Sequence, residues 1–434
     1  MTDKKDLDSR FLALLQERIE TFFMIGNYVI KNEISTSRRF DFSIMQEILL
    51  LEIFLDNHGS RTNKKYAYFT ELVATIRNLA NIMYFSKHVI ERIPIYQIEE
   101  SKKNEQALFD RTEEFYLWAL LTMRKLYNAV TLEAHSLGLK TPTGEFEVKT
   151  HKMGPEDDFQ LEYNIEIDEV ELGVKRILEL TNKYRKVARA IQRENFGKRY
   201  KPKDLPTLIP LRVDEKKARK FQNILHGVQS DYDTYVRGSS EEQQNPNLKR
   251  LKGYISISMH LLEIVSWMSH ICERHLCSIR TTPVKERIAE IIGAEELLQE
   301  MVLFGMNNAN KYLMLGNDAA EKILTFYSNP ISMELPVPKP IGFHARPSHY
   351  ISLIVNEFGT DVFLIFDGHE YSCKSVMMLL QAGAEISEAG LETVTFKGDE
   401  KVLNDLKILA ENNYCEDSDI PPALNYLRIA RNFL

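Results

Sequence analysis

The sequence predicts a multidomain protein: a mainly α-helical N-terminal region (a helical bundle with a small β-hairpin insertion), then a small α+β domain. The chain has 434 residues, which is too long for one ordinary core. Apolar residues recur three and four apart through most of the chain, whereas short β-type runs alternate with short helices after Asn329-Pro330. Residues 412–434 are predicted to form a terminal amphipathic helix after Pro421-Pro422.

Residues 1–138 are predicted to form the first domain, an antiparallel bundle of four long helices. From Phe11 onward, apolar residues follow the period of a helix with one buried face. Residues that end helices follow at His58-Gly59-Ser60, at Ile93-Pro94 and at Gly138.

Residues 139–330 are predicted to form a second helical region with a β-hairpin near residues 145–167. Apolar and charged residues alternate on both sides of a polar loop at Met153–Asp158, which is typical of paired strands. Helical periodicity resumes at Val170. The region lacks a Gly-rich phosphate loop of the Walker type.

The composition favours a cytoplasmic protein. The cysteines are scattered and suggest no disulfide framework, which fits a reducing compartment. The first residues lack the apolar stretch of a signal peptide, and charged residues interrupt the best apolar candidate, Phe42–Leu55, so no membrane span is expected. The net charge of -7 makes general nucleic-acid binding unexpected.

The segment with the clearest chemistry is Gly342–Ser348, between a β-type run and an apolar-periodic helix. Pro347 suits the first turn of a helix, so His344 is predicted to lie just before the helix N-terminus. Free N–H groups and the helix dipole favour an anion there. Arg346 adds a guanidinium that matches phosphate oxygens, and Gly342 lets a bulky group approach the backbone.

His344 is therefore a candidate phosphate acceptor. Near neutral pH much of a histidine's imidazole is uncharged and nucleophilic without a separate base. A phosphorylated imidazole can then pass the group onward. The alternative is an ordinary loop histidine, because a bare His-Ala-Arg-Pro tetrapeptide also occurs by chance.

The neighbouring residues resemble the HPr phosphocarrier family of the bacterial sugar phosphotransferase system. The family has a Gly-(Leu/Ile)-His-Ala-Arg-Pro motif, which stands here as Gly342–Pro347. A Lys-Ser-Ile-Met segment opens the family's second helix, and Lys374–Met377 matches it. Ser375 follows His344 by 31 residues, as in the family. Gly383 falls where the family has a glycine after that helix.

The resemblance implies an HPr-like open-faced sandwich over residues 331–411, with three helices on one face of a four-stranded antiparallel sheet. The local sequence agrees with it. Asp367-Gly368 suits a hairpin turn, and Asp399 is a candidate N-cap of the last helix. Prolines at every second position from Pro336 lack N–H groups on the same strand edge, which predicts an edge strand.

The resemblance also implies roles for single residues. His344 would accept phosphate from an Enzyme I-like donor charged by phosphoenolpyruvate, and Arg346 would stabilise the phosphoryl group. Gly342, Ala345 and Pro347 would support the phosphate loop. No cofactor and no metal are expected.

Partner docking and regulation are implied as well. An apolar docking patch would comprise Phe343, Val376, Met377 and Leu380, beside Ala345 of the loop. Ser375 would match the serine that HPr kinase phosphorylates in some bacteria. It can equally serve as a structural helix N-cap.

Three features depart from the family pattern or from an ordinary open-faced sheet. Ile341 replaces a small polar residue, so the loop loses one potential hydrogen-bonding side chain. Met378 replaces a glycine or lysine and makes the docking patch more apolar. The strand Val362–Phe366 is apolar on both faces, which suggests that the helical region, the C-terminal helix or a second protomer covers the sheet.

A second group of reactive side chains comprises His270, Cys272, His275 and Cys277, within eight residues. On one continuous helix they cannot all face a single ion, because Cys272 and His275 lie on a different face from the other two. Core packing is the simpler interpretation, and a metal site is the alternative.

Basic residues dominate from Lys183 to Lys220 in an otherwise acidic protein. A solvated face is the simplest interpretation. The alternatives are a surface for an acidic protein partner, a phosphorylated ligand or nucleic acid.

The leading hypothesis is a phosphotransferase-system protein whose HPr-like domain relays or senses a phosphoryl group on His344 through the fused helical region. It would act as a phosphocarrier with a phosphohistidine intermediate rather than as a free-standing enzyme. Its partners would be an Enzyme I-like donor and sugar-specific subunits or HPr kinase, and a homo-oligomer is also compatible. The alternatives are a scaffold that binds proteins without transferring phosphate, and a nucleic-acid-binding regulator.

Overall fold

The computed structural model describes residues 4–32, 38–96, 98, 102–146, 173–193, 214–276 and 283–430. Two compact units can be distinguished. The helical unit comprises Met1–Asp168, Val187–Ser230 and Lys249–Gly316. The C-terminal unit comprises Glu169–Lys186, Asp231–Leu248 and Asn317–Leu434. Each is described by itself.

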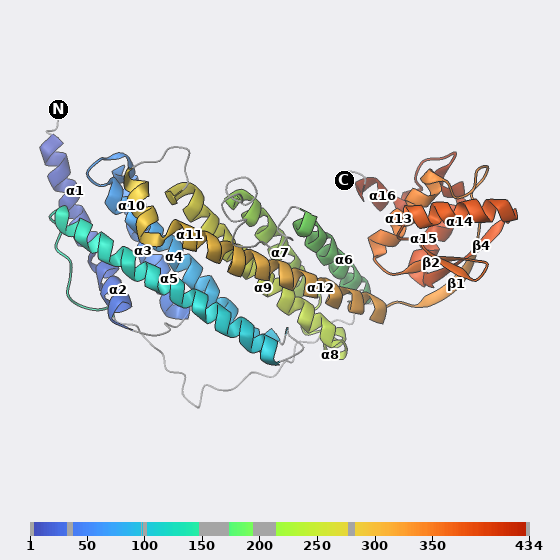
Figure 1. Cartoon of the computed structure of the whole chain (residues 1–434), viewed down its shortest axis with the longest axis horizontal. Helices are drawn as coiled ribbons and strands as arrows, with labels where there is room; N and C mark the ends of the chain where they lie inside the picture. Colours follow the sequence, from blue (N-terminus) through green and yellow to red (C-terminus); the bar gives the residue numbers. More distant parts are fainter. Residues whose placement is uncertain are drawn as a thin grey trace. The chain divides into compact units, whose positions relative to one another are not determined.

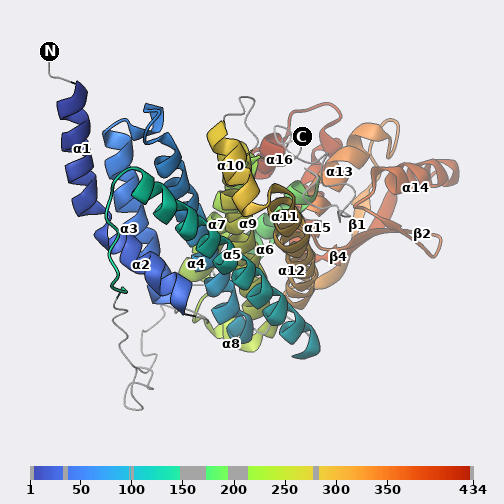
Figure 2. The same cartoon turned by 60° about the vertical axis from the view of Figure 1, so that its left-hand side comes forward.

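The described residues of the N-terminal part of the helical unit form five helices rather than the four expected, because the chain bends at Ile19. They are α1 (Lys4–Arg18), α2 (Glu20–Lys31), α3 (Arg38–Asn57), α4 (Ala67–Tyr96) and α5 (Lys102–Ser136). Helices α3, α4 and α5 lie side by side (Figures 1 and 2). On α5, Leu108, Phe115 and Leu126 are among the buried residues that recur three or four apart, as the periodicity predicts.

The remaining helices complete the helical region. They are α6 (Gly173–Ile191), α7 (Glu215–Tyr235), α8 (Ser240–Gln244), α9 (Pro246–His270), α10 (Pro283–Ile292), α11 (Ala294–Gln299) and α12 (Asn307–Phe326). Of the expected β-hairpin near residues 145–167, Glu145 and Phe146 lie in a loop, and the rest is outside the described residues.

One segment of the described chain, Pro246–Leu276, is long and apolar enough to cross a membrane. The most apolar 18-residue window of this segment is 83% buried inside the structure. That degree of burial is typical of a core helix, and α9 is such a helix.

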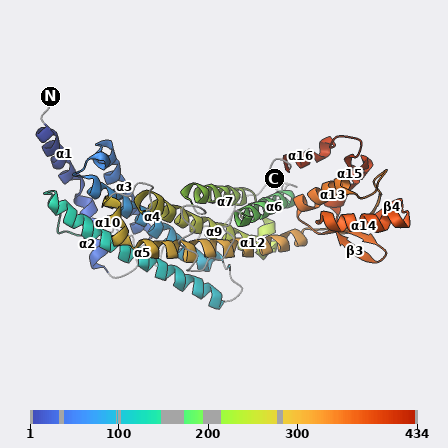
Figure 3. The same cartoon turned by 45° about the horizontal axis from the view of Figure 1, so that its top comes forward.

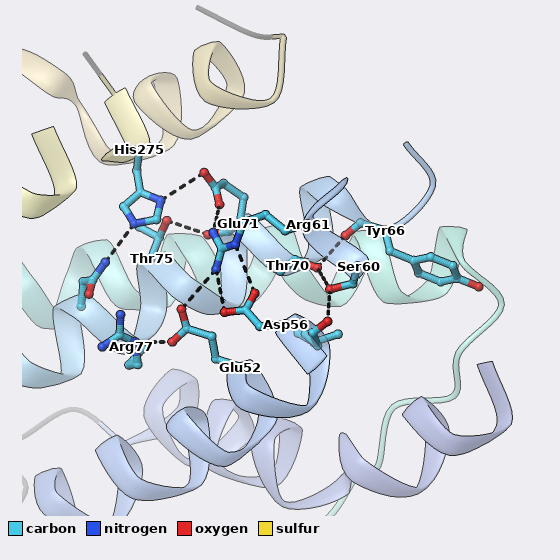
Figure 4. Close-up of polar contacts among 12 residues, drawn as sticks. Glu52, Asp56, Ser60, Arg61, Tyr66, Thr70, Glu71, Thr75, Arg77 and His275 are labelled. Carbon is cyan, nitrogen blue, oxygen red and sulfur yellow. Dashed lines mark hydrogen bonds and ion pairs between the residues drawn. The ribbon is translucent and has the colours of Figure 1, made fainter. Parts of the chain in front are cut away.

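Ionic side chains form a buried network inside the helical unit (Figure 4). Arg61 pairs with Glu71 over 2.8 Å and with Glu52 over 3.3 Å, and both carboxylates are about nine-tenths buried. Arg77 pairs with Glu52, and His275 lies 3.3 Å from Glu71. These pairs compensate charges that would be costly to bury alone.

The segment from His270 onward is not a regular α-helix. Helix α9 ends at His270 and a π-helical turn, Ile271–Leu276, follows. The wider turn brings the rings of His270 and His275 to 5.5 Å between centroids, although five positions separate them. His275 and Cys272 are buried, Cys277 lies outside the described residues, and no metal-binding group of three side chains occurs among those described.

The C-terminal unit contains a four-stranded antiparallel sheet with the strand order β1-β4-β2-β3. The strands are β1 (Pro330–Pro336), β2 (Val362–Phe366), β3 (His369–Ser372) and β4 (Thr393–Asp399). Helices α13 (Ala345–Phe358), α14 (Val376–Ala389) and α15 (Glu400–Glu411) pack on one face of the sheet (Figures 1 and 3). This arrangement is the predicted open-faced sandwich.

Strand β1 lies at the edge of the sheet, as predicted, and among the described strands it pairs with β4. The strand ends at Pro336, so Pro338 and Pro340 lie beyond it rather than within the strand as expected. A proline removes a donor from the free edge of such a strand without breaking the pairing on the other edge.

The core lies between the sheet and the three helices. Val362 and Leu364 of β2 point into it, together with Phe396 of β4. Phe363 and Ile365 point to the opposite face, where both remain partly exposed. Cover of that face by another element or by a second protomer stays a prediction.

Turns and caps of the sandwich follow the local sequence. Asp367 and Gly368 both have positive φ, 46° and 76°, as the tight hairpin turn between β2 and β3 requires. The side chain of Asp399 accepts a hydrogen bond from the N–H of Lys401 over 2.9 Å and caps α15.

The chain after α15 packs onto the same core. It forms short 3-10 turns at Asn413–Cys415 and Pro422–Leu424, then the short helix α16 (Tyr426–Ala430). The described helix is shorter than the one expected, because a turn at the prolines occupies part of the segment. Residues 431–434 lie outside the described residues.

Candidate functional site

His344 lies at the N-terminus of α13, as the sequence predicted. It is the N-cap residue, with extended backbone (φ -84°, ψ -167°), and the helix begins at Ala345. The carbonyl of His344 accepts the first helical hydrogen bond, from the N–H of Ser348 over 3.1 Å. The side chain of His344 makes no capping hydrogen bond, so it satisfies none of the free main-chain N–H groups in the first turn.

The backbone at this helix start offers donors to an anion. No described residue accepts a hydrogen bond from the main-chain N–H groups of Ala345 or Arg346. Pro347, in the first turn, has no N–H to satisfy. Free N–H groups at a helix N-terminus favour a bound anion.

Two glycines shape the loop that carries His344. Gly342 has φ +79°, a left-handed conformation that favours glycine. Gly383 lies inside α14 and not after that helix, which corrects the expectation from the family pattern. A Cβ on Gly383 would lie 2.5 Å from the carbonyl oxygen of Phe343, so α14 and the loop can approach closely only because this residue is glycine.

Glu416 covers one side of the histidine. The Nε2 atom of His344 lies 3.0 Å from Oε2 of Glu416 and is shielded from solvent. The contact does not meet the geometry of a hydrogen bond, although the two atoms are close enough to form an ion pair when the ring carries a charge. The imidazole is 31% exposed and the Glu416 side chain 11%.

Arg346 also contacts Glu416. Its Nη1 donates to the main-chain oxygen of Glu416 over 2.9 Å. A guanidinium has five N–H donors, so this contact leaves others for a phosphate. Burial raises the pKa of the neighbouring Cys415 thiol, and Glu416 contributes to the shift, so that thiol remains neutral.

The residues expected to form a docking patch differ in exposure. Met377 is 73% exposed and Ile341 67%, and Met378 is exposed beside them. Val376 and Leu380 are partly exposed. Phe343 is buried, and its ring lies 5.7 Å from that of Tyr414, so it belongs to the core rather than to an exposed patch. Ala345 is exposed next to His344.

Ser375 caps α14. Its hydroxyl oxygen accepts a hydrogen bond from the N–H of Met378 over 3.3 Å. The prediction that Ser375 is a helix N-cap is therefore confirmed. Its regulatory role stays a prediction. Ser375 itself is partly exposed.

Part of the basic segment contacts acidic groups of the C-terminal unit. On α6, Lys183 pairs with Asp231, Arg185 with Glu321, and Lys186 with Glu357. Residues 194–213 lie outside the described residues. These three basic side chains are therefore paired within the C-terminal unit.

Sequence reasoning missed Glu416. The segment Asn412–Asp417 has no apolar period and no motif, and its contact with His344 joins positions far apart in the sequence. Asn413 is compatible with the turn before Glu416, because asparagine tolerates the left-handed conformation in which this turn begins.

Comparison with known families agrees with the geometry. Residues 331–407 match the family model described as the PTS HPr component phosphorylation site. No curated protein and no solved structure matches the chain. The matched segment contains the sheet, α13 and α14, and His344 at the start of α13. Residues 331–407 therefore form an HPr domain of the phosphotransferase-system type, joined to a large helical region without a family assignment.

Proposed function

We propose that the protein is a phosphocarrier or phosphorylation sensor of the phosphotransferase system, with His344 as the phosphate acceptor. The observation that carries this proposal is the position of His344 before the open N-terminus of α13, next to Arg346. The fused helical region would relay or sense the phosphorylation state. HPr domains generally receive phosphate from Enzyme I, so an Enzyme I-like protein is the proposed donor.

The proposed acceptor site has the parts that phosphoryl transfer needs. The uncharged imidazole supplies a nucleophile, and the N–H groups of Ala345 and Arg346 supply fixed donors for phosphate oxygens. The guanidinium of Arg346 supplies positive charge within the same turn. Gly342 and Pro347 would hold the loop in shape.

The direct test is phosphorylation of the full chain by phosphoenolpyruvate and Enzyme I. We expect an acid-labile phosphate on the unchanged protein and its loss in His344→Ala. His349→Ala is the matched control, because His349 is an exposed histidine of the same helix. Absence of phosphate on the unchanged, folded protein would contradict the proposal.

The exposed apolar residues beside His344 would form the partner-docking surface. Met377, Val376 and Leu380 are the proposed contacts, since Met377 is exposed and the other two are partly exposed. Exposed apolar side chains favour a protein partner. HPr domains are typical of cytoplasmic proteins, and we propose that this protein is cytoplasmic.

The alternative function is a scaffold that keeps the fold for protein binding without transferring phosphate. The exposure of Ile341 favours it, because an apolar residue stands beside the acceptor. Binding of phosphotransferase-system proteins without any phosphorylation of His344 would select this alternative. Salt-dependent retention on heparin would instead favour a nucleic-acid-binding regulator that uses the basic segment.

A further inference from the structure

A cavity in the helical unit is lined mainly by charged side chains. Its volume is about 540 Å³, which is in the range of small-molecule sites. The positive side chains that line it are those of Arg61, Arg77, Arg274 and Lys285. They come from the turn after α3, from α4, from the π-helical turn and from α10. The cavity therefore lies where four segments of the helical unit meet.

Positive charge exceeds negative charge among the described residues of this lining. Its carboxylates are those of Glu52 and Glu71, so four positive side chains face two negative ones. Burial lowers the pKa of His270, although Glu215 opposes the shift, so that ring adds no positive charge near neutral pH. The excess is opposite in sign to the net charge of the whole protein, which is -7. A cleft with such an excess attracts anions.

The carboxylates hold two guanidiniums at the wall of the cavity (Figure 4). Arg61 donates to Glu71 over 2.8 Å and to Glu52 over 3.3 Å, and its Nε donates to Asp56 over 3.1 Å. Glu52 also pairs with Nε of Arg77. The donors of Arg61 are therefore mostly used within the protein.

Arg77 retains donors that no described residue uses. Its side chain is only 17% exposed, and its Nε is the atom that contacts a carboxylate. No described residue accepts a hydrogen bond from its terminal nitrogens, Nη1 and Nη2. A guanidinium has five N–H donors, so four of them face no acceptor. Because largely buried donors are normally paired, unpaired donors at the wall of a cavity indicate a site for an anion.

The π-helical turn supplies a second, independent observation. Such turns are rare and frequently occur at functional sites. This one places His270, Arg274 and His275 on the wall of the same cavity. Two side chains of α4 hold it, because Nε2 of His275 lies 3.1 Å from Asn78 and Nδ1 lies 3.3 Å from Glu71. The unusual helix geometry therefore shapes this cavity.

We propose that the cavity binds a small molecule that carries a phosphate group. A phosphate ester has about two negative charges at neutral pH, which matches the excess of the lining. Its oxygens suit the planar guanidiniums of Arg77 and of exposed Arg274, and the ammonium of Lys285 adds a point charge. The volume leaves room for an organic group beside the phosphate. The site lies in the helical unit and does not rest on the function proposed for His344.

The test uses the full chain and the fluorescence of Trp267. The centre of the Trp267 ring lies 5.5 Å from Cζ of Arg77, so an anion bound at Arg77 should change the emission of the ring. The chain has two tryptophans, and Trp118→Phe leaves Trp267 as the single reporter. At constant ionic strength, we expect a saturable change with glycerol 3-phosphate. Succinate should bind about tenfold more weakly, because its two charges lie on separate groups.

Substitutions at the wall locate the binding site. Arg77→Gln and Arg274→Gln should each weaken binding of glycerol 3-phosphate about tenfold, because each removes a charged donor. Titration calorimetry measures these affinities, since Arg77→Gln also alters the surroundings of Trp267. Arg274 is exposed, so Arg274→Gln should unfold at the same temperature as the unchanged protein. Arg18→Gln is the matched control, because it changes an exposed arginine of α1 that does not line the cavity.

Three results would overturn the proposal. The first is no saturable binding of glycerol 3-phosphate or inorganic phosphate to the unchanged protein at millimolar concentrations. The second is an affinity that is the same in Arg77→Gln and Arg274→Gln as in the unchanged protein, or that falls equally in Arg18→Gln. The third is succinate binding as tight as that of glycerol 3-phosphate, which would exclude recognition of a phosphate group.

Discussion

The guanidinium of Arg185 donates to the main-chain oxygen of Gly359 over 2.9 Å, at the point where α13 ends. Gly359 has φ +77°, and a Cβ there would overlap Nη1 of Arg185. The Arg185 side chain is only 4% exposed and also pairs with Glu321. Glycine is therefore required both by the backbone and by the buried guanidinium.

Gly359→Ala should destabilise the C-terminal unit by more than the left-handed backbone alone explains. The backbone contributes about 1 kcal/mol, and displacement of the buried Arg185 adds to it. Gly390→Ala is the control, because Gly390 also has positive φ, 64°, but no atom lies within 4 Å of the added Cβ. Urea unfolding followed by circular dichroism measures the difference, and equal losses in both variants would refute the role of Arg185.

Features that depend on a few neighbouring residues could be predicted from the sequence. The turn at Asp367-Gly368, the cap at Ser375 and the position of His344 each follow from the chemistry of adjacent positions. The four-stranded antiparallel sheet followed from the family resemblance rather than from periodicity. The prolines of β1 then agreed with its edge position.

Features that join distant positions could not be predicted. Glu416 reaches His344 through a turn whose strain is offset by Lys339 and Pro336, and no local pattern encodes that turn. The π-helical turn after α9 is similar, because the sequence there fits an ordinary helix equally well. Tertiary packing decides both.

Gly383→Ala should weaken both stability and phosphate acceptance. The added Cβ would lie 2.5 Å from the carbonyl oxygen of Phe343, so α14 must shift away from the loop of His344. Such overpacking costs about 1–3 kcal/mol. The rate of His344 phosphorylation and the urea midpoint measure the two effects.

A glycine without close neighbours controls for the change of residue type. Gly227 lies inside α7, and nothing lies within 4 Å of an added Cβ. Gly227→Ala should therefore stabilise the protein, by about 0.5–1 kcal/mol, through a better helix propensity. A destabilising Gly227→Ala or a neutral Gly383→Ala would contradict this account of the packing.

Ser375→Ala should cost about 1 kcal/mol, because the N–H of Met378 loses its cap. Ser375→Asp retains a capping oxygen and should keep most of that stability. If HPr kinase also acts on Ser375, both variants should lose the modification while only one loses stability. Chemical unfolding and a kinase assay on the same samples separate the structural and regulatory roles.

The buried carboxylate of Glu71 should make the helical unit sensitive to acid. Burial alone raises the pKa of Glu71, but His275, Arg61 and Lys285 outweigh burial and leave the pKa below its ordinary value of 4.5. A carboxyl group whose pKa is lowered on folding stabilises the folded state above its unfolded pKa. That stability is lost as the pH falls through the lowered folded value.

Glu71→Gln should therefore flatten the acid dependence of stability. The unchanged protein loses stability below pH 4.5 as Glu71 takes up a proton, whereas glutamine cannot titrate. At neutral pH Glu71→Gln should be less stable than the unchanged protein, since Arg61 loses a charged partner 2.8 Å away. Glu114→Gln removes a carboxylate that is 72% exposed and should leave the pH profile unchanged. Urea unfolding at neutral and acidic pH measures the free energy of unfolding of both proteins. The same dependence on pH in the unchanged protein and in Glu71→Gln would show that Glu71 does not cause the loss of stability in acid.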